Sequence, residues 1–225
     1  AASRTVPADR QVHSLHGYFL RAGDTEIPIL YKVDRIRDGK SFTTRRVVAV
    51  QRGHAIFTLS ISFQIEESGL SHQFPMPEAP RPESLLDERE LRLEQAAHWA
   101  PEYQAHAETT IAIDLRPVAP QDMLDPKPAE PRQQCWMRSA DALPDDPRIH
   151  QCVLAYLSDW SLLDTATRPH GISFMQPNLQ SASLDHAMWF HRRFRADEWL
   201  LYEQDSPNAS GARGFNRGLI YNQAG

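Results

Sequence analysis

Four consecutive segments near the start of the chain have the composition of β-strands. Each is rich in β-branched and aromatic residues, the side chains that pleated sheets favour. The turn-forming pairs Asp38-Gly39 and Arg52-Gly53 separate neighbouring segments, so we expect the chain to reverse direction there. The sequence therefore predicts an antiparallel β-meander. Its strands are expected at Gln11–Leu20, Pro28–Ile36, Lys40–Gln51 and His54–Ile65.

A proline-rich stretch, Pro75–Leu85, ends this pattern and marks the expected junction between two parts of the chain. The charged segment that follows, Leu86–Trp99, has the spacing of a moderately amphipathic surface helix. The second part returns to strands on either side of a proline-bearing loop, Pro117–Pro131. These later strands are expected at Thr109–Leu115, Arg132–Arg138, Gln180–Phe190, Glu198–Gln204 and Arg213–Asn222.

The composition limits the classes of function that the chain can have. With 225 residues, 41% of them hydrophobic, it is long enough to bury a core as one large domain or two small ones. A net charge of −5 provides no overall positive field for binding nucleic acid. Two cysteines, Cys135 and Cys152, are too few for a disulfide framework and lack the spacing of metal ligands. No run reaches the ~18 apolar residues of a membrane span, so we expect a soluble, cytoplasmic protein without a metal or cofactor.

One aspartate, Asp159, lies in an otherwise apolar run of helix length, His150–Leu163. Proline and acidic residues just before the run are tolerated at a helix N-terminus, and apolar residues occur almost all round the predicted helix. A central helix is therefore expected. A buried carboxylate must be compensated, which makes Asp159 a candidate for chemistry. Ala155, one turn earlier, is small enough to leave room for a substrate or a water. The alternative is a structural aspartate that accepts hydrogen bonds from a neighbouring strand or loop.

Ser183 begins a second string of interest, Ser183-Leu184-Asp185-His186, which resembles Ser14-Leu15-His16 in the first part. This loose internal similarity suggests that one helix-plus-sheet unit has been duplicated. Ser183, Asp185 and His186 do not make a serine-hydrolase triad, because no G-x-S-x-G elbow is present and neighbours on one strand cannot align as a relay. Strand alternation would place Ser183 away from the more apolar face, unless it lies at a bulge or a strand end.

Several longer strings carry a resemblance to the acyl-CoA thioesterase II family, which has a double-hotdog fold. They are HSLHGYFLRAGD, DGKSFTTRRVVAVQRG, LAYLSD, RPHG, SLDHAMWFHR and EWLLYEQDSPNASGARGFNRG. The resemblance covers nearly the whole chain and implies an α+β fold of two tandem hotdog units, each a curved antiparallel sheet wrapped around a central helix. It implies a first unit at residues 1–82 that lacks its central helix, a connecting helix at 83–106, and a second unit at 107–225 that lacks its last strand.

The resemblance also implies hydrolysis of fatty acyl-CoA, with a reactive aspartate at Asp159 and a reactive hydroxyl at Ser183. A third family residue, a glutamine, falls beyond Gly225, and Gln223 does not match it. A carboxylate in an apolar site can act as a general base, because burial raises its pKa toward neutrality. We therefore expect Asp159 to activate a water and Ser183 to orient it, although direct attack by Asp159 through an anhydride stays open.

Other features leave alternatives open. The chain is alternatively a non-catalytic acyl-CoA-binding or assembly module, whereas a hydratase is disfavoured because no Asp-x₄-His loop precedes a helix. Arg213 and Arg217, with Arg192 and Arg193, are candidates to meet the CoA phosphates, but solvated strand arginines are the favoured interpretation. By resemblance we expect a homo-oligomer. Four apolar residues are candidates for lining an acyl tunnel or for ordinary core positions: Trp160, Phe174, Met188 and Trp189.

Overall fold

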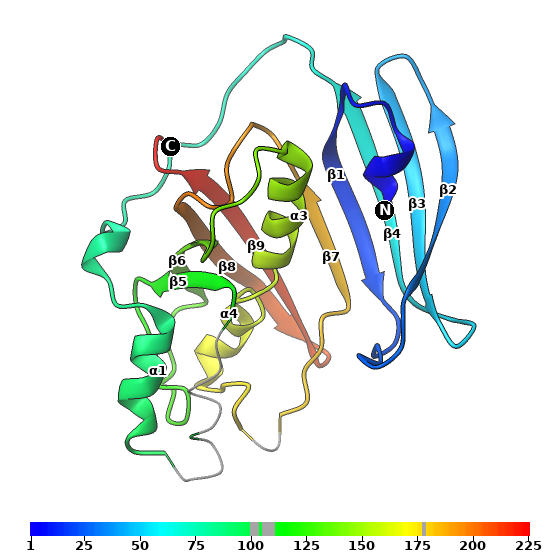
Figure 1. Cartoon of the computed structure of the whole chain (residues 1–225). Helices are drawn as coiled ribbons and strands as arrows, with labels where there is room; N and C mark the ends of the chain where they lie inside the picture. Colours follow the sequence, from blue (N-terminus) through cyan, green and yellow to red (C-terminus); the bar gives the residue numbers. More distant parts are fainter. Residues whose placement is uncertain (100–103, 105–110, 177–178) are drawn as a thin grey trace. The chain divides into compact units, whose positions relative to one another are not determined.

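The predicted meander is present in the computed structural model (Figure 1), which describes residues 1–99, 104, 111–176 and 179–225. Its four strands pair antiparallel in the order β2-β3-β4-β1. Arg52 and Gly53 both have positive φ, 49° and 80°, as a tight hairpin turn between twisted strands requires. The strands are β1 (Arg10–Phe19), β2 (Leu30–Asp38), β3 (Phe42–Gln51) and β4 (His54–Ile65).

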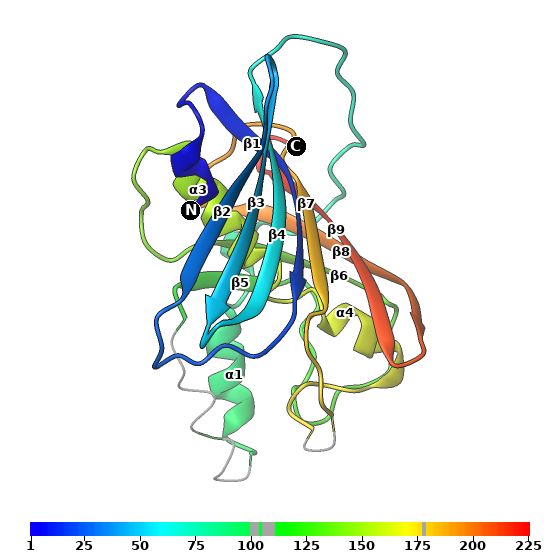
Figure 2. The same ribbon diagram turned by 90° about the vertical axis from the view of Figure 1, so that its right-hand side faces the viewer.

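A fifth strand from far along the chain, β7 (Asp185–Trp189), completes this sheet beside β1 (Figure 2). The two strands are antiparallel, and their register pairs Ser14 with Trp189 and Tyr18 with Asp185. The two strings that resemble each other in the sequence therefore lie side by side and run in opposite directions.

This five-stranded sheet belongs to the first of two compact units, which comprises Ala1–His72, Asp146–Gln151 and Ala182–Phe194. Its buried core is apolar and includes the N-terminal turn; the core residues are Ala2, Val12, Val47, Ile61 and Phe63. Arg45 is 1% exposed and binds that turn, donating to the carbonyl oxygen and the hydroxyl of Thr5 at 3.0 and 2.9 Å. The guanidinium also reaches Asp38 and the carbonyl of Arg37, so its burial is compensated by hydrogen bonds.

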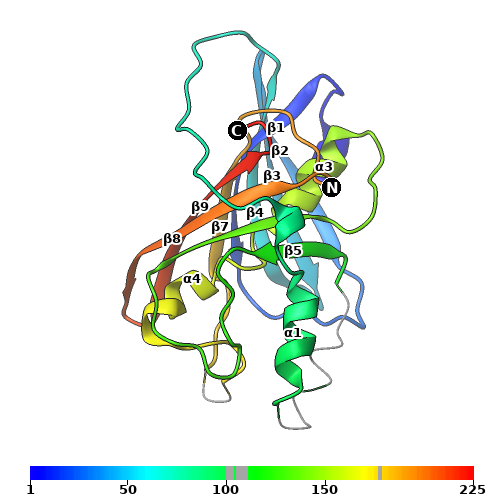
Figure 3. The same cartoon turned by 90° about the vertical axis from the view of Figure 1, so that its left-hand side faces the viewer.

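The second unit comprises Gln73–Asp145, Cys152–Ser181 and Arg195–Gly225. Its antiparallel sheet has the order β5-β6-β8-β9 (Figure 3). Three of the four strands expected after the proline-bearing loop belong to this sheet, and the strand expected to end at Gln204 continues to Ser210. The strands are β5 (Ile113–Pro117), β6 (Arg132–Ser139), β8 (Leu200–Ser210) and β9 (Arg213–Asn222).

The proline-rich stretch packs against one face of this second sheet. Trp136, Trp199 and Leu201 are buried there against Met76, Ala79 and Leu85. The indole Nε1 of Trp136 donates to the carbonyl of Pro80 at 2.8 Å. The predicted surface helix follows as α1 (Glu88–Ala96), which begins with a capping box between Asp87 and Glu90. The segment expected to be a junction is thus an integral part of the second unit.

Strand alternation gives the opposite face of the second sheet a different character. The cross-strand pairs on this face change from polar to apolar along β6: Gln133 with Gln204, Cys135 with Tyr202, and Met137 with Leu200. The short helix α4 (Asp164–Thr167) contacts β8 and β9. It follows α3 (Pro147–Leu157), the helix expected from the apolar run.

Candidate active site

Asp159 lies in a turn just after α3 rather than inside the helix. The predicted helix was expected to continue to Leu163, and this part of the prediction is wrong because α3 ends at Leu157. The amide of Ser158 still makes a helical bond, donating to the carbonyl of Leu154, four residues earlier. The next two amides donate to carbonyls only three residues earlier, so the chain tightens at Asp159 into a 3₁₀-like turn.

The helix ends where the Ser158 hydroxyl donates to the Ala155 carbonyl at 3.0 Å, since that carbonyl would accept from the Asp159 amide in a continued helix. The sheet holds the turn that follows. Tyr202 donates its hydroxyl to the carbonyl oxygen of Ser158 at 2.8 Å. In a continued helix, that carbonyl would accept from the amide of Leu162 instead. Ser158 is 2% exposed, so its carbonyl needs a partner within the protein.

A group of buried polar side chains holds the following turns against the same sheet. Gln204, fully buried on β8, donates to the hydroxyl of Ser161 at 2.6 Å and accepts from the hydroxyl of Thr165 at 3.1 Å. The amide nitrogen Nε2 of its cross-strand neighbour Gln133 lies 2.8 Å from the carbonyl oxygen of Ser161, 3.0 Å from Thr165 Oγ1 and 2.7 Å from Gln204 Oε1. Arg168 donates to Gln133 Oε1 at 3.3 Å. We call Gln133, Ser161, Thr165 and Gln204 the glutamine network.

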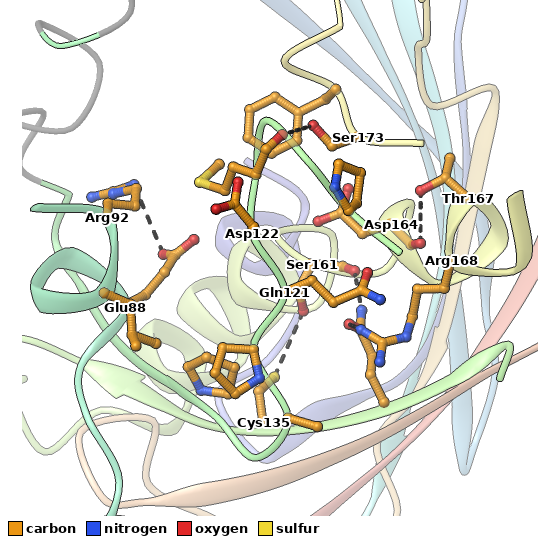
Figure 4. Close-up of a pocket in the computed structure, with 18 of the residues that line it drawn as sticks. Glu88, Arg92, Gln121, Asp122, Cys135, Ser161, Asp164, Thr167, Arg168 and Ser173 are labelled. Carbon is orange, nitrogen blue, oxygen red and sulfur yellow. Dashed lines mark hydrogen bonds and ion pairs between the residues drawn. The ribbon is translucent and has the colours of Figure 1, made fainter. Parts of the chain in front are cut away.

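Next to the glutamine network the second unit contains a cavity of about 130 Å³ (Figure 4). Apolar side chains make much of its wall, and they come from α1, β5, the proline-bearing loop and the segment after α4; they are Leu91, Leu115, Met123, Ile172 and Phe174. Ser161, Gln133 and Cys135 also line it, together with Glu88 and Asp164. Among the four apolar residues singled out in the sequence, Phe174 is the one on the cavity wall.

Two of the three carboxyl groups that line the cavity, those of Glu88 and Asp164, are biased toward their neutral forms. Burial, reinforced by the negative charge of Glu88, raises the pKa of Asp164 to about 6. Burial also raises the pKa of Glu88, against the opposing effects of Arg92 and a hydrogen bond with the indole of Trp160. Figure 4 shows the Glu88 carboxylate beside Arg92, 3.9 Å from its guanidinium.

Two further groups near this turn stay protonated at neutral pH. Burial raises the pKa of the Cys135 thiol to about 12, so this cysteine is not a nucleophile. Burial, followed by the negative charges of Cys135 and Asp159, raises the pKa of Tyr202 far above its ordinary value. The Tyr202 hydroxyl is thus a permanent hydrogen-bond donor that lies within electrostatic reach of the Asp159 carboxylate.

Ser183 belongs to the first unit and lies in extended chain two residues before β7 begins. The backbone beside it is fixed, because the amide of Phe19 donates to the carbonyl of Leu184 at 3.0 Å. Ser183 is half-buried. This strand-end position removes the difficulty that strict alternation raised for its side chain. Asp159 belongs to the second unit, and Gln223 lies in the exposed turn after β9.

Sequence reasoning missed the residues that hold the Asp159 turn. Tyr202 and Gln204 lie two residues apart on β8 and so share one face of the sheet; a tyrosine and a glutamine at that spacing in a predicted strand were the available signal. The sequence pattern placed Glu88 only in a charged surface helix.

In the described part of the chain no helix is both long and apolar enough to cross a bilayer, and no group of three or more His, Cys, Asp or Glu side chains could hold a metal ion.

Two antiparallel sheets with few helices, neither closed into a barrel, are the α+β architecture of hotdog proteins. A solved structure from Alicyclobacillus acidocaldarius described as having a hot dog fold matches with a TM-score of 0.72 at 17% identity, over 96% of this chain and 74% of that one. An acyl-CoA thioesterase II, TesB2, from Mycobacterium marinum matches with a TM-score of 0.79 at 48% identity. That match covers 99% of this chain and 78% of the other. The predicted fold class is confirmed.

Sequence comparisons agree with the structural ones. The family model described as acyl-CoA thioesterase matches residues 108–225, and the model of the acyl-CoA thioesterase N-terminal domain matches residues 1–64. Acyl-coenzyme A thioesterase 8 of Mus musculus is 43% identical over all of this chain and 72% of its own length. Acyl-CoA thioesterase 2 of Haemophilus influenzae is 37% identical over all of this chain and 79% of its own length. The chain therefore belongs to the acyl-CoA thioesterase family, which confirms the predicted class of enzyme, a thioester hydrolase.

Proposed function

We propose that this protein hydrolyses acyl-CoA to a free fatty acid and CoA, with Asp159 as general base and Ser183 as the group that orients the attacking water. The observation that carries the proposal is the family membership, together with the position of Asp159 on a tightly anchored turn beside a cavity.

The chemistry follows from the residue types. Asp159 removes a proton from water as the water oxygen attacks the thioester carbonyl carbon, which gives a tetrahedral oxyanion. The oxyanion then collapses and the carbon–sulfur bond breaks. The CoA thiolate leaves and takes up a proton, which Asp159 returns. A thiolate is a good leaving group, so base catalysis and orientation of the water carry the reaction.

The acyl chain has a candidate site in the cavity of the second unit. Ser161 lines this cavity and is two residues from Asp159, so the two α-carbons are at most ~7 Å apart. The cavity, about 130 Å³, is close in size to the engineered apolar cavity of about 150 Å³ that binds benzene in another protein. It would therefore hold a section of roughly six carbon atoms of the acyl chain.

Thiol release from acyl-CoAs of several chain lengths tests the reaction. We expect turnover by the wild-type protein, and a fall in kcat of about 10²–10⁴-fold in Asp159→Asn, the range that loss of a general base produces. Ser183→Ala should lower kcat less. Binding of acyl-CoA without any turnover would instead support the binding-module alternative.

The anhydride route is separated from the water route by a quench experiment. Single-turnover reactions are stopped in acid, and peptides containing Asp159 are examined by mass spectrometry. Direct attack would leave an acyl group on that peptide, whereas base catalysis leaves it unmodified. Association into a homo-oligomer is a separate expectation, which light scattering in solution tests.

A further inference from the structure

Two side chains of β8, Tyr202 and Gln204, anchor the turn that carries Asp159 from both sides. We infer that they are positioning residues, which set the location of the Asp159 carboxylate through the backbone without acting on the substrate themselves. This inference rests on the proposed role of Asp159 as base. Nothing in the family resemblance identified either residue.

The first anchor precedes Asp159 by one residue. The Tyr202 hydroxyl donates to the Ser158 carbonyl, and that carbonyl is part of the peptide group that ends at the Asp159 amide. The peptide group is planar, so fixing its oxygen fixes the direction in which the Asp159 backbone leaves it. Because burial raises the pKa of Tyr202, its hydroxyl stays protonated at all moderate pH values and this hydrogen bond is kept throughout catalysis.

The second anchor follows Asp159 by two residues. Gln204 donates to the Ser161 hydroxyl, and Gln133 donates to the Ser161 carbonyl. Gln204 and Thr165 are both fully buried, so these bonds are shielded from water and are stronger than they would be at a surface. Asp159 therefore lies on a segment of three residues, Asp159 to Ser161, that is held at each end by the same strand.

The sheet is shaped to make the first anchor possible. A Cβ at Gly218, on the neighbouring strand β9, would lie 2.1 Å from Cε2 of the Tyr202 ring and 2.9 Å from its hydroxyl oxygen. The ring thus occupies space that any other residue at position 218 would fill. Because glycine at position 218 has no side chain, the Tyr202 ring can pack closely against β9, and from there its hydroxyl reaches the Ser158 carbonyl.

Small displacements of a base are costly, since a misplacement of about 1 Å can lower a rate by about 10²-fold. Tyr202→Phe tests the inference, because it removes the hydroxyl and keeps the ring that packs on Gly218. We expect kcat for acyl-CoA hydrolysis to fall about tenfold or more, with KM changed less than about twofold. Tyr221→Phe is the matched control: Tyr221 lies in the same sheet on the opposite face, against the Trp136 cluster, and kcat should not change.

A double-mutant cycle separates positioning from a merely structural role. If Tyr202 acts through Asp159, Tyr202→Phe should have no further effect on the residual rate of Asp159→Asn. Equal loss of rate in both backgrounds would overturn the inference. Gln204→Asn, which keeps the amide and shortens its reach, should behave in the same way and gives a second, independent variant.

The outcomes also distinguish this inference from the proposed function. If Asp159→Asn retains wild-type turnover, the role of Asp159 as base fails. If Asp159→Asn is impaired while Tyr202→Phe and Gln204→Asn both keep wild-type kcat, the base role stands and the positioning inference alone is wrong. Thermal unfolding of each variant shows that the measured rates come from folded protein.

Discussion

The Tyr202 ring lies so close to Gly218 that a methyl group added at position 218 would overlap it at 2.1 Å. Contacts under 3 Å require something to move, and here the obstacle is a buried aromatic ring rather than a flexible chain end. The absence of a side chain at position 218 therefore affects the turn that carries Asp159, because Tyr202 holds that turn through the Ser158 carbonyl.

Gly218→Ala should therefore destabilise the protein by about 1–3 kcal/mol, the range of overpacking substitutions. It should also lower kcat, because the Tyr202 hydroxyl is pushed away from the Ser158 carbonyl. Urea unfolding followed by fluorescence measures the first effect and thiol release the second. Gly69→Ala is the control, since nothing lies within 4 Å of a Cβ there, and its unfolding free energy should be unchanged or slightly raised.

Leu91→Trp should change the preference of the enzyme for chain length if the cavity holds the acyl chain. The larger side chain would fill space on the cavity wall, so activity on medium and long acyl-CoAs should fall while activity on the shortest substrates is kept. Leu93→Trp on the same helix is the control, because Leu93 is 39% exposed and does not line the cavity. An equal loss for all chain lengths with Leu91→Trp would contradict this assignment of the cavity.

Asp164 should make the stability of the protein depend on pH between about 4 and 6. Its pKa is about 6 in the folded protein and 3.8 in the unfolded chain, so the folded protein binds the proton more tightly. The contribution of Asp164 to the free energy of unfolding is therefore fully present below pH 3.8 and is lost as the pH rises through about 6. The shift of about two pKa units limits the effect to about 3 kcal/mol.

Asp164→Asn removes this titration, and its unfolding free energy should be higher than that of the wild type at pH 7 and similar at pH 4. Glu88 also has a raised pKa, so it adds a change of the same sign in both proteins. Chemical denaturation across this pH range is the measurement. A wild-type protein that gains stability from pH 4 to 6 relative to Asp164→Asn would contradict the prediction.

Arg45→Ala should destabilise the first unit by about 2–4 kcal/mol, because the carbonyls of Thr5 and Arg37 lose a donor and the packing of a side chain that is 1% exposed is removed. Amide hydrogen exchange around the N-terminal turn should speed up. The neighbouring Arg46 provides the control: its pair with Asp34 is exposed on both sides, so Arg46→Ala should cost less than about 0.5 kcal/mol. Equal losses of unfolding free energy in the two variants would contradict the prediction that the buried arginine stabilises the fold more than the exposed one.

The strands could be predicted because their pattern is local. Alternating side chains and turn pairs such as Arg52-Gly53 depend on neighbours in the sequence, and the structure has strands at nearly all the expected places. The end of α3 could not be predicted in this way. The apolar run continues to Leu163, but the helix ends at Leu157, and a tyrosine more than forty residues later binds the Ser158 carbonyl in the turn that follows.

The sequence by itself determined most of the strands, the family and the two residues, Asp159 and Ser183, that the family motifs single out. Only the tertiary structure decided what surrounds Asp159: the Tyr202 anchor, the glutamine network and the cavity beneath α1. The physical reason is that strand and helix patterns arise from residues close in sequence, whereas a buried hydrogen bond joins groups that become neighbours only after the chain has folded.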